Sequence, residues 1–361
     1  MKAPKKPDFE ILEFEGRTYH RHRKDRGVLR GALDFPAEKD RIERTVPGFP
    51  QILRVYRLRE GVERLFGNEV FFAEEKLDGY NARVFQHQGH LLAATRGGFI
   101  CPFTTEWASI WGKDKNLDSF FRDFPEHVLC GEVIGDNPYN WQRDPNMSPG
   151  AHFFIFEIMA PDGNFLPPDQ RYRLTADYGL PGVPKMGQYS AARIENLYEL
   201  MRELNDRGRE GVVLKDAAGK RMLKFVTPTT DLQDLKDALR IGFDLPSGFF
   251  FNRYLRASVF IKELGLNQEE YARRIGCAFL DGCPEPENFT QAGEQYTIYV
   301  QSEKTWNALE EQLKPRVLIA CDGKKEVRIL GRKMLRIDFR RIYQKSTQRY
   351  RKILRGHLHK D

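Results

Sequence analysis

The chain is poor in cysteine, and its few cysteines form no paired motif. Five cysteines are spread over 361 residues, an odd number without any C-x-x-C pair. This spacing argues against a zinc ribbon or a disulfide framework and favours a reducing compartment. We therefore expect a cytoplasmic protein whose cysteines stay free. They are Cys101, Cys130, Cys277, Cys283 and Cys321.

Long apolar segments are also missing. No run approaches the roughly 18 apolar residues that identify a membrane-spanning helix, and the N-terminal end is charged without an apolar signal core. We therefore expect a soluble protein without a membrane partner.

Several well-known catalytic and metal-binding motifs are absent. The sequence has no glycine-rich P-loop, no G-x-S-x-G and no H-E-x-x-H. Two H-x-H pairs, His20 with His22 and His357 with His359, could bind a metal, but no further ligand residues flank them. We expect these histidines to be exposed basic positions rather than a metal site.

Apolar and aromatic residues are frequent enough to build folded cores. They make up 40% and 12% of the chain, which argues against wholesale disorder. The net charge of +7 is concentrated near the C-terminus, where "RKMLRIDFRRIYQKSTQRYRKILRGHLHK" combines basic and aromatic residues. This pattern favours a polyanionic partner, first a nucleic acid and second a membrane surface, although a solvated helix face would look the same.

The residue pattern divides the chain into units that together predict an α+β fold. The first unit is polar and rich in arginine, the second alternates in period two as strands do, the third is helical, and the fourth mixes strands and helices. A length of 361 residues also suggests more than one domain. The predicted units are an N-terminal module (1–69), a mostly antiparallel domain (70–230), a helical region (231–290) and a basic α/β module (291–361).

Within the second unit, short apolar segments predict strands separated by glycine turns. "VFFAEEKL", "NARVFQ" and "HLLAATR" alternate in period two, and "HVLCGEVIG" and "AHFFIFEIM" are nearly continuous apolar strands. "EGVVLK" and "RMLKFV" predict a hairpin around "DAAGK", and "ARIENLYELMRELNDRG" predicts a helix that Gly208 ends.

The first strand carries a lysine where strand alternation places it inside a cleft. In "FFAEEKLDGYNARVF", Lys76 precedes an aspartate and a glycine between two apolar segments. Burial disfavours an ammonium ion, so we expect the pKa of Lys76 to fall and its neutral amine to act as a nucleophile. The alternative is a strand-edge lysine that points to water.

Further charged residues recur at strand ends of the same unit. Carboxylates among apolar strand residues are costly unless they bind a ribose, a cation or a lysine, so together these residues predict a polyphosphate and metal pocket. Taken singly, Phe156 could be a core residue, Arg96 a surface residue, and Glu132 and Glu210 ion-pair partners. The residues are Arg96 in "ATRGG", Glu132 in "CGEVIG", Phe156 in "IFEIM", Glu210 and Lys215 in "EGVVLK", and Lys224 in "MLKF".

The order of these segments over about residues 70–230 resembles the covalent nucleotidyltransferase superfamily of polynucleotide ligases and capping enzymes. "KLDG", "TRGG", "GEVIG", "FFIFEIM", "EGVVLK" and "MLKF" match its motifs I, Ia, III, IIIa, IV and V. Asn81 stands where DNA ligases and capping enzymes carry arginine and RNA ligases carry asparagine. "GDNPYNW" is similar to archaeal-type homodimeric ATP-dependent RNA ligases, in which a helical dimerisation region follows the catalytic domain.

The resemblance implies a fold and a reaction. The fold would be an antiparallel-sheet nucleotidyltransferase (adenylation) domain with a small N-terminal module, a helical dimerisation region and a mixed C-terminal module. The enzyme would be an ATP-dependent RNA ligase that joins 5′-phosphate and 3′-hydroxyl ends through lysyl-adenylate and RNA-adenylate intermediates. Lys76 would carry the AMP. The implied partners are RNA, ATP, Mg²⁺ or Mn²⁺, and a second copy of the chain.

The resemblance also implies a role for each site residue. Glu210, with Glu132 behind it, would guide the metal ion, and Arg96 and Glu132 would contact the ribose. Lys215 and Lys224 would neutralise the α-phosphate and help to keep Lys76 uncharged. Adenine would stack on Phe156, and the backbone at Glu75 would read the edge of the adenine. Asn81 would organise the RNA-joining steps, and Asp78 would brace the loop.

One position departs from the family pattern. Motif V often reads K-x-K, but Met222 occupies the first lysine position, so either a phosphate contact is missing or Arg221 or Lys220 replaces it. Two rival interpretations remain. One is a DNA ligase or a GTP-dependent capping enzyme, which "LRIDFRR" faintly resembles, and the other is an RNA-binding protein that has lost catalysis.

The dimer prediction rests on apolar residues after residue 230. Leu232, Leu235 and Leu239 share one predicted helix face, and "FDLPSGFFFNRYL" follows it. The alternative is ordinary packing against the catalytic domain.

Overall fold

The computed structural model describes residues 8–24, 28–37, 42–142, 147–315 and 317–357. Its antiparallel sheets and flanking helices confirm the predicted α+β class. Residues from two of the sheets line a cavity.

The first of these two sheets is antiparallel, with the strand order β10-β9-β7-β8. Its turn in "HQGH" has positive φ at Gln88 (48°) and Gly89 (76°), as the glycine pattern predicted. The strands are β7 (Tyr80–His87), β8 (His90–Thr95), β9 (Val128–Gly135) and β10 (Ala151–Met159).

The second sheet carries Lys76 and has the order β11-β6-β12-β13-β5. Its β12–β13 hairpin is the predicted one, whereas β5 pairs with β13 in parallel. The segment 1–69 therefore contributes one strand, β5, to the sheet that carries Lys76. The strands are β5 (Leu53–Arg54), β6 (Phe71–Lys76), β11 (Lys185–Tyr189), β12 (Gly211–Asp216) and β13 (Met222–Val226).

Helices cover the outer faces of both sheets. One face of the second sheet packs against α1 (Leu58–Phe66) and the predicted helix α5 (Ile194–Asp206), whose apolar residues share one core with the strands. The first sheet packs against α2 (Pro102–Asp114) and α3 (Leu117–Asp123), which the sequence pattern had not predicted, and α4 (Pro168–Asp177) follows β10.

A separate antiparallel sheet near the N-terminus packs onto the first sheet, around Phe35, Phe85 and Leu92. The contact is tight at Gly98 (φ 81°), where a Cβ atom would lie 2.6 Å from the Gly31 carbonyl oxygen. The strands, in sheet order, are β1 (Phe9–Phe14), β2 (Arg17–His22), β3 (Leu33–Pro36) and β4 (Ile42–Val46).

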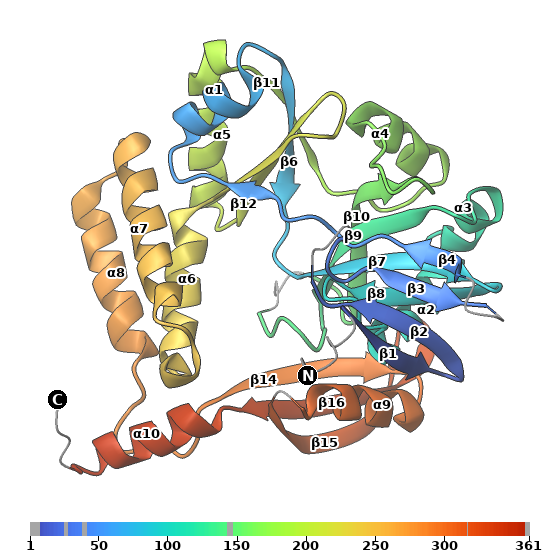
Figure 1. Cartoon of the computed structure of the whole chain (residues 1–361). Coiled ribbons are helices and arrows are strands. Elements are labelled where there is room, and N and C mark those ends of the chain that lie inside the picture. The colour runs from blue at the N-terminus through green and yellow to red at the C-terminus, as the bar shows by residue number, and fades with distance from the viewer. Residues whose placement is uncertain (1–7, 25–27, 38–41, 143–146, 316, 358–361) are drawn as a thin grey trace, which may run out of the picture.

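Three helices form a compact unit beside the second sheet (Figure 1). They are α6 (Pro228–Leu239), α7 (Gly248–Glu263) and α8 (Gln268–Gly282). Leu232 and Leu235 are buried among these helices, against Ala257, Ile261 and Tyr271. The apolar face that suggested a dimer is therefore largely used within the chain, so these leucines do not support the dimer prediction.

The C-terminal elements share a hydrophobic core with the first sheet. Trp306 and Phe339 belong to the same core as Trp107, and the Trp107 indole Nε1 donates to the Tyr299 carbonyl oxygen at 2.9 Å. The elements are β14 (Gly293–Val300), α9 (Glu303–Leu313), β15 (Leu318–Ile329), β16 (Arg332–Ile342) and α10 (Gln344–Leu354), with the sheet order β14-β16-β15.

The described residues contain no helix that is both long and apolar enough to cross a membrane. All five cysteines are free, as expected; Cys101 and Cys130 are buried.

Candidate active site

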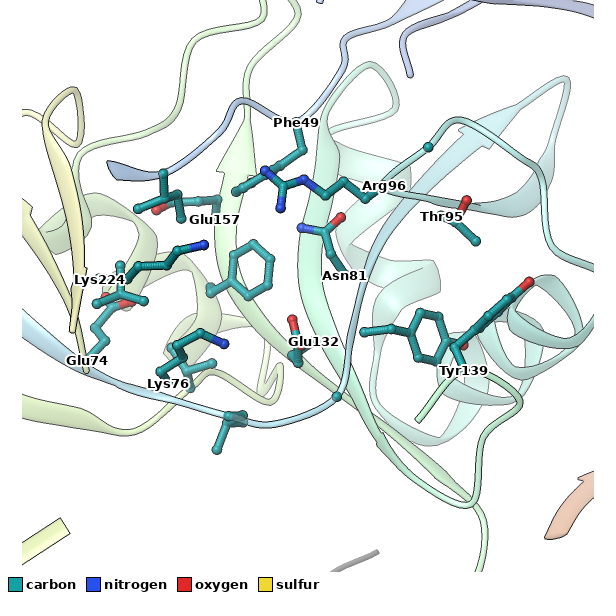
Figure 2. Close-up of a pocket in the computed structure, with 18 of the residues that line it drawn as sticks. Phe49, Glu74, Lys76, Asn81, Thr95, Arg96, Glu132, Tyr139, Glu157 and Lys224 are labelled. Atoms are coloured by element: carbon teal, nitrogen blue, oxygen red, sulfur yellow. The ribbon is translucent and has the colours of Figure 1, made fainter. Parts of the chain in front are cut away.

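The cavity between the two sheets has a volume of about 620 Å³ and gathers most of the residues that the sequence motifs singled out. Figure 2 shows Lys76 and Lys224 extending into the same space that Asn81 and Arg96 face from the other side. Glu210 is not among the lining residues but contacts one of them, Lys76. Asp78 is exposed and does not line the cavity. The predicted residues that line it are Glu75, Lys76, Asn81, Arg96, Glu132, Phe156, Lys215 and Lys224.

Lys76 stands where the chain passes from one sheet to the other. It is the last residue of β6, and Tyr80 already begins β7 of the other sheet. Gly79 makes this crossing possible, because a Cβ atom there would lie 2.3 Å from the Val133 carbonyl oxygen. The K-x-D-G spacing therefore places the amine at the mouth of the gap between the sheets.

The Lys76 amine is held by a carboxylate. Its Nζ donates to Glu210 Oε2 at 2.7 Å, and both side chains are mostly buried. Burial would lower the pKa of Lys76, but the negative charges of Glu210, Glu132 and Asp78 outweigh it and raise this pKa above the ordinary lysine value. The expectation of a lowered pKa at Lys76 is therefore wrong for the free protein.

The acidic groups around Lys76 repel one another. Burial raises the pKa of Glu132 to about 8; Lys76 opposes this shift, whereas Glu210 and Asp78 add to it. Desolvation also raises the pKa of Asp78, and the charges of Glu210 and Asp234 add to this, although water around the exposed side chain weakens the shift. Carboxylates that resist sharing a site fit a divalent cation, whose charge would relieve the repulsion.

A complete metal site is nevertheless not formed by the protein alone. Within the described part of the chain, no three His, Cys, Asp or Glu side chains are grouped closely enough to hold an ion. His20 stacks on Phe9, and His22 Nε2 lies 2.6 Å from Asp34 Oδ2. His359 lies outside the described residues.

Lys224 is the lysine whose pKa is lowered. Burial, together with the positive charges of Arg54, Lys76 and Arg96, lowers the pKa of Lys224 to about 8. Arg54 is its register partner on β5, so the two side chains share one face of the sheet. The Arg54 Nη1 is buried and has no hydrogen-bond partner among the described residues.

Met222 stands where the family often has a lysine that would contact phosphate, and the structure shows what surrounds this position. Met222 is buried on the cavity face, two residues before Lys224. Arg221 cannot replace the missing lysine, because its guanidinium donates to Asp216 Oδ2 at 2.8 Å and to the Leu65 carbonyl oxygen at 3.0 Å. The described cation beside Lys224 is instead Arg54, from a strand that the motif comparison did not cover.

Phe156 occupies a β-bulge. The register of β10 against β9 shifts between Ile155 and Glu157, and a bulge of this kind re-aims the extra side chain. Its ring lines the cavity and meets the Phe49 ring edge-on at 5.4 Å. A half-buried aromatic ring at this place suits a base, and the stacking of adenine on it stays a prediction.

Lys215 lies in a buried ion cluster rather than free in the cavity. Its ammonium lies 2.6 Å from both Glu74 Oε2 and Glu157 Oε1 and donates to the Phe156 carbonyl oxygen at 2.7 Å. Arg171 pairs with the other oxygen of Glu74. The charge of Lys215 is therefore balanced by two carboxylates, and its hydrogen bond holds the strand that carries Phe156. Its contact with the α-phosphate stays a prediction.

The backbone of the "TRGG" segment is packed within the protein, because Gly98 admits the close approach of the Gly31 backbone. The Glu75 backbone N–H donates to the Pro184 carbonyl oxygen at 2.9 Å, so this donor is not available to an adenine edge. The contact of adenine with the backbone at Glu75 stays a prediction. Arg96 is exposed and donates to the Pro50 carbonyl oxygen at 3.1 Å.

Sequence reasoning missed the parts of the wall that distant segments provide. Arg21 and Phe49 come from the N-terminal segment, Tyr80 and Tyr139 form an edge-on pair at 4.7 Å, and Gln312 comes from α9. No local motif marks these residues; only the docking of the N- and C-terminal elements brings them to the cavity.

Comparisons with known proteins agree with this geometry. A family model described as RNA ligase matches residues 69–226, and a model described as the ligase Pab1020 C-terminal region matches residues 238–357. An uncharacterized protein of Methanocaldococcus jannaschii is 30% identical over 348 residues, which cover 92% of this chain and 86% of that protein. The chain belongs to the RNA ligase family, and the resemblance drawn from its motifs is confirmed.

Solved structures resemble the whole chain as well. An archaeal ATP-dependent RNA ligase has a TM-score of 0.86 and 30% identity, covering 98% of this chain and 94% of that chain. A protein of Aquifex aeolicus, provisionally assigned as an ATP-dependent DNA ligase, has a TM-score of 0.89 and 28% identity, covering 98% and 97%. The protein is a ligase by family and by fold.

Proposed function

We propose that the protein is an ATP-dependent RNA ligase that works through AMP carried on Lys76. The observation that carries this proposal is the position of the Lys76 amine in the cavity, 2.7 Å from Glu210 and facing the same space as Lys224 (Figure 2). In the first step Nζ of Lys76 bonds to the α-phosphorus of ATP, the bond to the β-phosphate oxygen breaks, and pyrophosphate leaves.

Activation of Lys76 follows from its surroundings. Glu210 and Glu132 are our candidates for holding Mg²⁺ or Mn²⁺, in part through water, and such an ion would neutralise phosphate oxygens. Once these carboxylates share their charge with a cation, they no longer keep the proton on Lys76. With such an ion bound, the pKa of Lys76 would fall toward the value that burial alone favours, and its proton would pass to water.

Lys224 and Arg54 are the proposed phosphate contacts. They lie side by side on neighbouring strands, and Arg54 brings a buried donor without a described partner. A guanidinium can bind phosphate oxygens through two parallel hydrogen bonds, so Arg54 supplies the charge that Met222 lacks.

The later steps restore Lys76 and seal the RNA. An oxygen of the RNA 5′-phosphate attacks the adenylate phosphorus and the N–P bond breaks; the RNA 3′-hydroxyl then attacks the 5′-phosphate and AMP leaves. Asn81 Oδ1 is buried without a described hydrogen-bond partner and lines the cavity, which suits a group that orients an RNA hydroxyl. Phe156 would stack the adenine, at about 1–3 kcal/mol per base.

One similar structure bears an RNA ligase description and another a DNA ligase description, so the nucleic acid is tested directly. Asn81 favours RNA. The test supplies matched RNA and DNA strands with 5′-phosphate ends, together with labelled ATP or GTP. We expect labelling by ATP and joining of RNA; labelling by GTP alone, or joining of DNA alone, would overturn this assignment.

The proposed partners and location follow from exposed residues. Phe251, Phe279 and Leu280 are 66%, 49% and 72% exposed on α7 and α8, which suits a homodimer surface. Many arginines of β16 are paired with acids, as Arg340 is with Asp322, so α10 is the more available basic surface for RNA. The free cysteines suit the cytoplasm.

A further inference from the structure

A second cavity lies next to the catalytic one, on the other side of a short loop. It has a volume of about 220 Å³ and separates the loop after β9 from the sheet of β14 and β16. Tyr139 of this loop lines the catalytic cavity, whereas its neighbours Asn140 and Trp141 line the second one. We call this second space the loop cavity. It is lined by Gly135, Asp136, Asn137, Asn140, Trp141, Gln295, Tyr296, Thr297, Tyr299 and Arg336.

The loop that forms one wall is held rigidly. Asn137 Oδ1 accepts from the backbone N–H groups of Tyr139 at 2.9 Å and Asn140 at 2.8 Å. Asn140 Nδ2 in turn donates to Asp78 Oδ1 at 3.1 Å. Because Asp78 follows Lys76 by two residues, the loop cavity is physically tied to the loop that carries the nucleophile.

The lining has the chemistry of a nucleobase site rather than a phosphate site. Arg336 already donates to Asp338 Oδ1 at 2.9 Å, and the buried carboxylate of Asp136 would repel an anion. The side-chain amide of Gln295 can instead donate to and accept from the edge of a base. The Thr297 hydroxyl donates to Asp338 Oδ1 at 2.6 Å, so it can only accept from a base. The volume is below the usual range of small-molecule pockets, so a single ring system fits better than a whole nucleotide triphosphate.

Trp141 provides the aromatic face that such a site needs. The chain has four tryptophans, of which Trp107, Trp111 and Trp306 are buried, whereas Trp141 is 37% exposed. Trp141 lines the loop cavity together with the exposed side chain of Gln295. Proteins that read single-stranded RNA stack unpaired bases on exposed aromatic rings of this kind.

We propose that the loop cavity binds one unpaired base of the RNA strand whose end is joined at Lys76, with that base stacked on Trp141. The inference rests on the proposed RNA ligase function. It assigns to the protein an RNA contact beyond the nucleotide-binding cavity, and it restricts the substrate to RNA with an unpaired nucleotide close to the joined end.

The test uses the tryptophan itself as the probe. A short single-stranded oligoribonucleotide with a 5′-phosphate is titrated into the full-length protein while tryptophan fluorescence is recorded. We expect saturable quenching in the wild-type protein, because only Trp141 among the tryptophans is accessible for stacking. Trp141→Phe should bind the oligonucleotide within about threefold of wild type, measured by anisotropy of a labelled oligonucleotide, but without the quenching. Trp141→Ala should bind roughly tenfold more weakly, as expected for loss of one stacked base.

The matched control is Ile11→Ala, which removes an exposed apolar side chain on β1, far along the chain from the loop cavity. It should bind like wild type. Equal affinity of Trp141→Ala and wild type, absence of quenching in the wild-type protein, or equally strong binding of a blunt RNA duplex would overturn the proposal. Should Trp141→Ala fail to fold, as judged by its melting curve, the wild-type quenching still decides. Failure of the ligase function is recognised separately, because it removes labelling by ATP without removing RNA-dependent quenching.

Discussion

At the scale of single residues, the charge of Lys76 depends on the acids around it. In the free protein three carboxylates raise its pKa, so the amine is stored as an ammonium that donates to Glu210. The same acids suit a cation, and in the proposed mechanism cation binding frees the amine. This arrangement would keep the nucleophile inactive until ATP and metal are both present.

The raised pKa of Glu132 predicts that the stability of the folded protein depends on pH. Because burial raises its pKa to about 8, the folded protein holds a proton there that the unfolded chain releases near the ordinary value of 4.5. The contribution of Glu132 to stability therefore falls as pH rises from 5 to 8. Relative to wild type, the melting temperature of Glu132→Gln should improve progressively over this window. Glu126→Gln, at an exposed position, should show a constant difference; a constant difference for Glu132→Gln as well would refute the assignment.

The position of Arg54 predicts that its removal slows AMP transfer to the protein, and that a lysine introduced on the neighbouring strand restores the rate. Arg54→Ala should lower the rate of AMP transfer to the protein about 100-fold, because a buried phosphate donor is removed. Adding Met222→Lys to this variant should restore much of the rate, since residue 222 shares the cavity face with Lys224. Single-turnover labelling with ATP measures both. Arg64→Ala, an exposed arginine, is the control, and a rate for Arg54→Ala equal to that control would contradict the role.

At the scale of elements, the strands and hairpins around Lys76 could be predicted, and the walls that complete the site could not. Period-two alternation and glycine turns identified β6 to β10, β12 and β13, because each signal lies within a few residues. The N-terminal sheet, α2 and α3 carry no such signal. Phe49 reaches the cavity, and Arg54 reaches its place beside Lys224, only through tertiary packing. The charge state of Lys76 was mispredicted for the same reason, since Glu210 and Glu132 come from other strands.

The contact between α2 and the C-terminal sheet predicts a stability effect. Trp107 is 1% exposed and joins both parts through its ring and its indole donor. Trp107→Ala should lower the free energy of unfolding by about 3–5 kcal/mol, the usual cost of removing a buried large aromatic residue. Urea unfolding followed by circular dichroism measures it, with Leu330→Ala as an exposed control. A loss below about 1 kcal/mol would show that the two parts do not share a core.

At the scale of the whole molecule, the cavity combines segments from both ends of the chain. The helices α6 to α8 lie beside the second sheet (Figure 1). Leu232 and Leu235 pack inside this helical unit, so a dimer would have to use its outer residues. The exposed apolar side chains of α7 and α8 are the candidates, which places the proposed dimer surface away from the cavity.

The dimer prediction can be tested by mass. Light scattering at micromolar concentration should give twice the chain mass of 42.1 kDa, and Leu280→Asp should shift the protein toward the single-chain mass, because a charge cannot be buried unpaired in the interface. Leu330→Asp, on the turn between β15 and β16, should leave the mass unchanged. A wild-type protein with the single-chain mass would remove the dimer from this account.

The most direct measurement of the central claim is mass spectrometry of the protein after incubation with ATP and magnesium. We expect one AMP attached through a phosphoramidate bond to the peptide that contains Lys76, and no such product in Lys76→Ala, which should still join RNA that already carries a 5′-adenylate. An AMP adduct on a different residue, or an unmodified wild-type protein under conditions in which it joins RNA, would contradict the account.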